Sequence, residues 1–87
     1  MASGELVGKV THVFDKINVA VIKLSGDLKV GDSVHFLGSH TAFQQEVTSM
    51  QVEHEVVTQG KAGGEVAIKA TQRVRGGDSV YRLSGGG

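Results

Sequence analysis

Apolar and polar residues alternate along most of this chain, and valine and isoleucine supply many of the apolar positions. A period of two is typical of β-strands, and no stretch keeps the spacing of an amphipathic helix for more than one turn. We predict strands over residues 5–14, 19–24, 33–37, 43–54, 66–70 and 78–83, with short extended pieces at 28–30 and 56–59. Six or seven short strands fit an all-β fold, a small closed or nearly closed antiparallel β-barrel.

The longest predicted strand, residues 43–54, changes parity along its length. Val47 falls on one face by strict alternation, whereas Met50 and Val52 fall on the other. A β-bulge near Ser49 brings all three side chains to the core side, and a bulge also helps a small barrel to bend.

The first predicted strand has no such slip, so alternation places Val10, His12 and Phe14 together on one face. Most aromatic side chains of a chain this short belong in its core. Phe43 stands at the start of its strand, and we expect it to be the aromatic residue exposed for stacking. The aromatic residues are Phe14, Phe36, Phe43 and Tyr81.

The phrase Gly-Asp-Ser-Val occurs twice, beginning at Gly31 and again at Gly77. Each glycine allows the positive φ of a tight turn, and the following Asp32 or Asp78 can accept backbone amide hydrogen bonds across it. We interpret both copies as structural corners that lead into a strand. A carboxylate site built from both aspartates is disfavoured, because nothing in the sequence places them together.

Length and composition predict one domain over residues 5–83, between flexible ends at 1–4 and 84–87. The glycine-rich end is interpreted as a disordered tail rather than a conjugation tail. Nine Lys or Arg balance nine Asp or Glu, which is unlike a protein that binds nucleic acid by net charge. The chain has no cysteine, no apolar leader and no membrane-spanning run, so we expect a cytoplasmic protein.

Candidate catalytic and metal-binding groups are sparse. The four histidines lie in separate segments, and in a strand the carboxylates of Glu53 and Glu55 face away from His54. Ser33 and Ser79 have no neighbouring general base in the sequence. The sequence therefore favours a protein that is not an enzyme and that holds no metal or other cofactor.

Several strand phrases together resemble a known family: "LKVGDSVHFLG", "VTSMQVEH" and "KAGGEVAIK". They are similar to the second domain of translational GTPases, the small β-barrel of elongation factor Tu and initiation factor 2. The likeness is closest to short proteins called translation elongation factor-like. A similar module also ends some collagenase-like U32 peptidases. The chain has no GxxxxGK[ST] phosphate loop, so we expect no nucleotide cofactor.

The resemblance implies a non-catalytic binding module, associated with translation through RNA or a ribosomal component. Phosphate contacts need cations, and the candidate contacts are Lys16, Lys61, Arg73 and Arg75. The alternative is a protein–protein interaction module of unknown pathway, related to barrels appended to larger enzymes such as U32-type peptidases. Val19 and Val21, on the outer side of the second predicted strand, favour this alternative.

Overall fold

The computed structural model describes residues 4–83, and this part of the chain is all-β, as the alternation predicts. Its strands are β1 (Gly4–Phe14), β2 (Val19–Leu24), β3 (Leu28–Lys29), β4 (Ser33–Leu37), β5 (Ala42–Glu46), β6 (Met50–Val52), β7 (Glu55–Val57), β8 (Gln59–Gly60), β9 (Glu65–Lys69) and β10 (Ser79–Leu83). The expected flexible ends at 1–3 and 84–87 lie outside the described residues, and Gly4 already begins β1.

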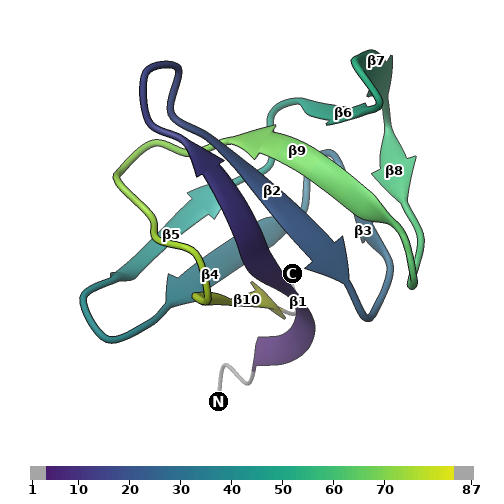
Figure 1. The fold of residues 1–87 in the computed structure, drawn as a ribbon. Coiled ribbons are helices and arrows are strands. Elements are labelled where there is room, and N and C mark those ends of the chain that lie inside the picture. The colour runs from purple at the N-terminus through teal and green to yellow at the C-terminus, as the bar shows by residue number, and fades with distance from the viewer. Residues whose placement is uncertain (1–3, 84–87) are drawn as a thin grey trace.

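Eight strands form one antiparallel sheet in the order β5-β4-β10-β1-β2-β9-β6-β7, and β3 pairs with β8 in a second, two-stranded sheet. Figure 1 shows β1, β2 and β9 in front, with β4 and β5 behind them. The inward side chains form a single buried cluster that includes Ile22, Phe36, Met50 and Ile68. Burial of these apolar side chains holds the curled sheet together.

The outer strands of this sheet, β5 and β7, do not pair with each other in the described part of the chain, so closure into a barrel is not confirmed. A side chain connects β5 to the end of β9 instead. The Gln45 amide donates to the Lys69 carbonyl at 2.8 Å and accepts from the Thr71 backbone N–H at 2.7 Å. One side-chain amide thus takes the place of a peptide group between two strands.

Two bulges in β1 make the predicted facing of this strand wrong. The register shifts between Leu6 and Gly8 against β10, and between Val10 and His12 against β2. Each extra residue reverses the alternation, so Val7 and Val10 are both buried while His12 is exposed. The unbroken alternation of the sequence therefore gave no sign of the two β-bulges in this strand.

The predicted strand 43–54 is divided in the structure. β5 ends at Glu46 and β6 begins at Met50, so an irregular segment replaces the single bulge expected near Ser49. The facing prediction holds, because Val47 and Met50 are fully buried and Val52 packs against the core. A break changes side-chain parity just as a bulge does, so the sequence pattern did not distinguish them.

The first Gly-Asp phrase forms a tight corner before β4. Gly31 has a φ of 98°, and the Asp32 carboxylate accepts the backbone N–H of Lys29 at 3.0 Å. The corner also holds a buried valine: Gly31 N–H donates to the Val47 carbonyl at 2.8 Å, and Val47 N–H donates to the Asp32 carbonyl at 2.9 Å. These bonds fix the point where the chain enters β4.

The second phrase repeats this geometry before β10. Gly77 has a φ of 95°, and the Asp78 carboxylate accepts the N–H of Arg75 at 2.9 Å. Gly77 N–H donates to the Val10 carbonyl at 2.7 Å, and Val10 N–H donates to the Asp78 carbonyl at 2.8 Å. Asp78 is buried against Gly38, where an added Cβ would lie 1.9 Å from its Oδ1. β4 and β10 pair antiparallel, so the corners stand at opposite ends of one ladder.

Candidate functional site

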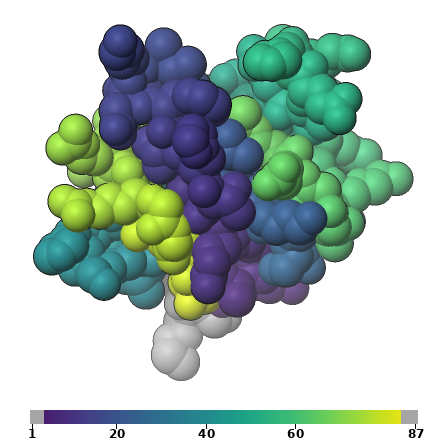
Figure 2. All heavy atoms as spheres, viewed as in Figure 1, coloured from purple at the N-terminus to yellow at the C-terminus, as the bar shows by residue number. Residues whose placement is uncertain are grey.

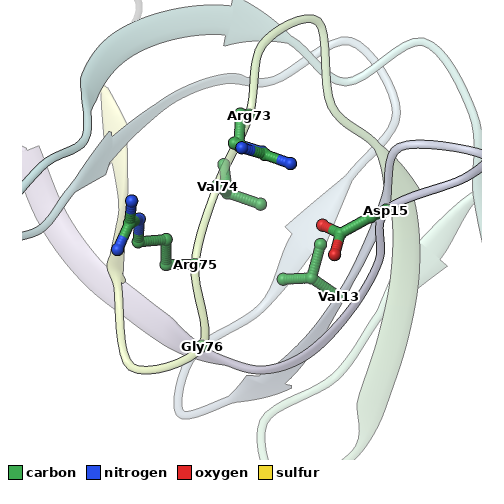
Figure 3. A pocket seen from close by; sticks show the side chains of 6 residues that line it. All are labelled: Val13, Asp15, Arg73, Val74, Arg75 and Gly76. Carbon is green, nitrogen blue, oxygen red and sulfur yellow. The ribbon is translucent and has the colours of Figure 1, made fainter.

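Two of the four predicted cations lie around one small depression of about 280 Å³. Arg73 and Arg75 belong to the loop before β10, and Val13 and Asp15 line the depression from the β1–β2 side. Figure 3 shows the Arg73 guanidinium on the same side of the loop as Asp15, whereas Arg75 points to the other side. The Asp15 carboxylate, which the sequence argument did not consider, offsets part of the positive charge of this depression.

The other two predicted cations are not drawn into this depression. Lys16 follows Asp15 in the turn after β1 and is exposed, but it does not line the hollow. Lys61 stands in the loop before β9, where its carbonyl accepts the N–H of Gly64 at 3.1 Å. Arg73 and Arg75 therefore border the same depression with their side chains on opposite sides of the loop, while Lys16 and Lys61 lie outside it.

A larger hollow of about 610 Å³ lies on the outer face of the sheet, and we call it the β2–β9 groove. Figure 2 shows the opening between the β1–β2 turn, coloured dark blue, and the β6–β7 turn, coloured green. The lining residues come from four strands, β1, β2, β6 and β9, and from the connections beside them. They are Phe14, Ile17, Val19, Val21, Gln51, Val52, Glu53, His54, Gly64, Glu65, Val66 and Ala67.

The floor of the β2–β9 groove is a cross-strand row. Val21 of β2 stands opposite Ala67 of β9, and Ala67 stands opposite Gln51 of β6. Directly opposed residues point to the same face of a sheet, so these side chains form one continuous strip. Val21 and Ala67 are both half-buried although they point away from the core. Val21 and Ala67 therefore form an apolar strip that the domain itself covers only in part, and the amide of Gln51 ends it.

Two hairpin turns form the walls of the groove. On one side the β1–β2 turn carries Phe14 and Ile17, whose side chains are 47% and 60% exposed. On the other side the β6–β7 turn carries Glu53 and His54. Exposed large apolar side chains beside a partly covered apolar floor are typical of an interaction surface.

The aromatic residues are arranged differently from the sequence prediction. Phe43 is buried rather than exposed, and it stacks on Phe36 with 5.1 Å between ring centroids. Phe14 is the exposed one, with the His12 ring edge-on to it at 4.6 Å. The bulge between Val10 and His12 turns Phe14 outward. The prediction failed because it assigned strand faces without that bulge.

No group of three or more His, Asp or Glu side chains within residues 4–83 is placed to hold a metal ion. Over the same residues, no helix is both long enough and apolar enough to cross a membrane. The candidate site is therefore a surface rather than a metal centre: the β2–β9 groove. Sequence reasoning found Val19 and Val21 of this groove but missed its walls, because alternation carries no information on which outward residues become neighbours.

No protein-family model matches this chain. Curated relatives do match: the chain is 41% identical over 78 residues to an uncharacterized protease of Methanocaldococcus jannaschii, covering 88% of this chain and 19% of that protein. It is 31% identical over 79 residues to a collagenase of Porphyromonas gingivalis, covering 88% of this chain and 22% of that protein. The chain thus spans about a fifth of the length of these relatives.

Two solved structures share the fold, each with a TM-score of 0.84. Both are of the C-terminal domain of a Geobacillus thermoleovorans protein described as a U32 peptidase, and one is its selenomethionine variant. They are 18% and 17% identical to this chain. The matches cover 88% and 90% of this chain and 98% and 91% of those chains.

These findings correct the resemblance to translational GTPases and elongation factor-like proteins. The curated relatives are a protease and a collagenase, and the solved structures with this fold are of a U32 peptidase C-terminal domain; none of them is a translation factor. The predicted link to translation and the ribosome rested on that resemblance, and it is not supported. The other comparison made from the sequence, to the module that ends some U32 peptidases, agrees with them.

Proposed function

We propose that this chain is a non-catalytic protein-docking module of the kind appended to a larger enzyme, and that the β2–β9 groove is its docking surface. The observation that carries the proposal is the groove itself, an apolar strip on the outer face of the sheet between two hairpin turns. Burying such a strip against another protein removes apolar surface from water, which is the main favourable term in protein association.

The comparisons support the appended character of the module. The matched region is about a fifth of the two curated relatives, whose names describe a protease and a collagenase. A domain of this fold was also crystallised as the C-terminal domain of a larger protein. Domains of one chain meet through interfaces like those between proteins, and the fold alone does not supply the chemistry.

Candidate contacts with a partner include Lys16, Lys61, Arg73 and Arg75. Arg73 and Arg75 border the smaller depression, which shares the β1–β2 turn with the groove: Asp15 lines the depression, and Phe14 and Ile17 line the groove. A partner that covers the turn therefore reaches both hollows. We propose these arginines and Lys16 as peripheral contacts, and Lys61 as a contact outside the main surface.

The test is site-specific photo-crosslinking with a matched control. Phe14 is replaced by p-benzoylphenylalanine, and Leu37 of β4, 44% exposed against 47% for Phe14, is replaced in a second protein. We expect the Phe14 probe to give a discrete crosslinked protein in a lysate of the source organism. This product should disappear when Ala67→Glu places a charge in the groove floor. The same products from both probe positions would contradict the proposal.

The non-catalytic part of the proposal has its own assay. We expect the purified chain to leave gelatin and casein intact, since no group of three or more His, Asp or Glu side chains in residues 4–83 is placed to hold a catalytic metal ion. Hydrolysis that follows the protein through purification and is lost on a single substitution would show an enzyme instead.

A further inference from the structure

The β2–β9 groove is acidic where it is charged, and this property points to the chemistry of its partner. Its lining includes two acidic residues, Glu53 and Glu65, and no Lys or Arg. This step rests on the proposed function, because it concerns the partner of that same docking surface.

Neither carboxylate is in an ion pair within residues 4–83. The ion pair found within residues 4–83 joins Arg82 to Glu5. Lys23 stands opposite Glu65 across the β2–β9 ladder, but its Nζ donates to the Gly63 carbonyl at 3.2 Å. The Glu65 carboxylate accepts the Thr11 hydroxyl at 3.5 Å, a long contact that leaves its charge in place.

The turn that presents Glu53 has an unfavourable backbone. β6 and β7 are joined by two residues, with Val52 opposite Glu55, and Glu53 and His54 have φ values of 51° and 68°. A two-residue turn with positive φ at both positions favours Asn-Gly, because most side chains are strained there. Residues kept in such a conformation cluster at binding sites, where the strain positions a functional side chain.

We propose that the groove binds a protein segment in which apolar side chains are flanked by Lys or Arg. The apolar side chains of the partner lie on the strip formed by Val21 and Ala67, and its cations meet Glu53 and Glu65 at the edges. Apolar burial provides affinity, while opposite charges at the rim select the partner and reject acidic ones. The strained turn holds the Glu53 carboxylate at the rim.

The experiment compares two synthetic peptides by NMR titration of the ¹⁵N-labelled chain. Both contain the same alternating valines and isoleucines, and the intervening residues are lysine in one peptide and glutamate in the other. We expect the lysine peptide to shift the resonances of Val21, Ala67 and Glu53. We also expect it to bind about tenfold more tightly than the glutamate peptide at low salt, with the preference shrinking as salt screens the charges.

Charge reversal provides the decisive variant. Glu53→Lys combined with Glu65→Lys should invert the preference, so that the glutamate peptide becomes the tighter one. Glu46→Lys changes an exposed carboxylate on β5, outside the groove, and is the matched control. Well-dispersed amide spectra of all variants establish that each is folded.

The outcomes separate this inference from the proposed function. Equal binding of both peptides with shifts in the groove overturns the basic partner but leaves the groove as a docking surface. An unchanged preference in the Glu53→Lys, Glu65→Lys variant also overturns it. Absence of groove shifts with either peptide overturns the inference, and crosslinking through position 14 then decides on docking independently.

Discussion

The two Gly-Asp corners and the β6–β7 turn all bring the chain through positive φ, but with different residues. The corners place Gly31 and Gly77 at the left-handed position, where glycine is unstrained. The β6–β7 turn places Glu53 and His54 there. The corners bind two buried valines, Val47 in the segment after β5 and Val10 of β1, whereas the turn borders the β2–β9 groove. The two corners thus have glycine at positive φ, whereas the β6–β7 turn beside the groove has two residues that are strained there.

The two corners also differ from each other, and this difference predicts the largest effect. Asp78 is 5% exposed, whereas Asp32 is more accessible. Asp78→Ala leaves the Arg75 N–H without its carboxylate in a buried site, and we expect a loss of about 2–3 kcal/mol of unfolding free energy. Asp32→Ala should cost about 1 kcal/mol, because water can replace the lost acceptor. Urea unfolding of both variants measures the difference, and equal losses would show that burial does not distinguish the corners.

The glycines of the corners come next. No atom lies within 4 Å of a Cβ added at Gly31 or Gly77, so alanine fits sterically with its surroundings. Gly31→Ala or Gly77→Ala should therefore lower the free energy of unfolding only through the strain of an alanine at positive φ, by about 1–2 kcal/mol for each. Thermal unfolding checks both variants. Gly76→Ala is the control, because Gly76 lacks positive φ and has the same open space.

The β6–β7 turn should respond in the opposite direction. Glu53→Asn combined with His54→Gly supplies the residues that this turn type favours, and we expect a gain of about 1 kcal/mol in unfolding free energy. The same change removes a rim carboxylate, so binding of the lysine peptide should weaken. Calorimetry and the NMR titration are made on one sample. A variant that is stabilised and binds as tightly as the parent would show that neither the strained turn nor the Glu53 carboxylate contributes to binding.

The smallest effect is expected at the depression. Arg73→Glu combined with Arg75→Glu changes two exposed side chains that make no side-chain hydrogen bond or ion pair within residues 4–83. Stability should change by less than about 0.5 kcal/mol. Crosslinking through position 14 should persist with reduced yield, because these arginines are peripheral to the groove. Complete loss of the crosslink would place the main surface at the depression instead.

The resemblance to translation factors shows what a strand-and-turn pattern can report. The phrase "LKVGDSVHFLG" contains the first corner and β4. Its Gly31 and Asp32 form the hydrogen bonds that fix this corner. Unrelated functions share folds of this kind, so a likeness built on corners describes architecture and not activity. The other two phrases, "VTSMQVEH" and "KAGGEVAIK", contain residues that line the groove, such as Gln51, Glu53 and Ala67, but as strand phrases they too describe architecture.

The sequence by itself determined the all-β class, most strand positions and the inward facing of Val47 and Met50. These follow from local alternation and turn chemistry, which act over a few residues. Tertiary structure alone decided the bulges of β1, the break before Met50, the burial of Phe43 and the Gln45 link between strands. Each depends on partners distant in the chain. The groove is of the same kind, because its floor and walls meet only when β2, β9 and β6 are paired side by side.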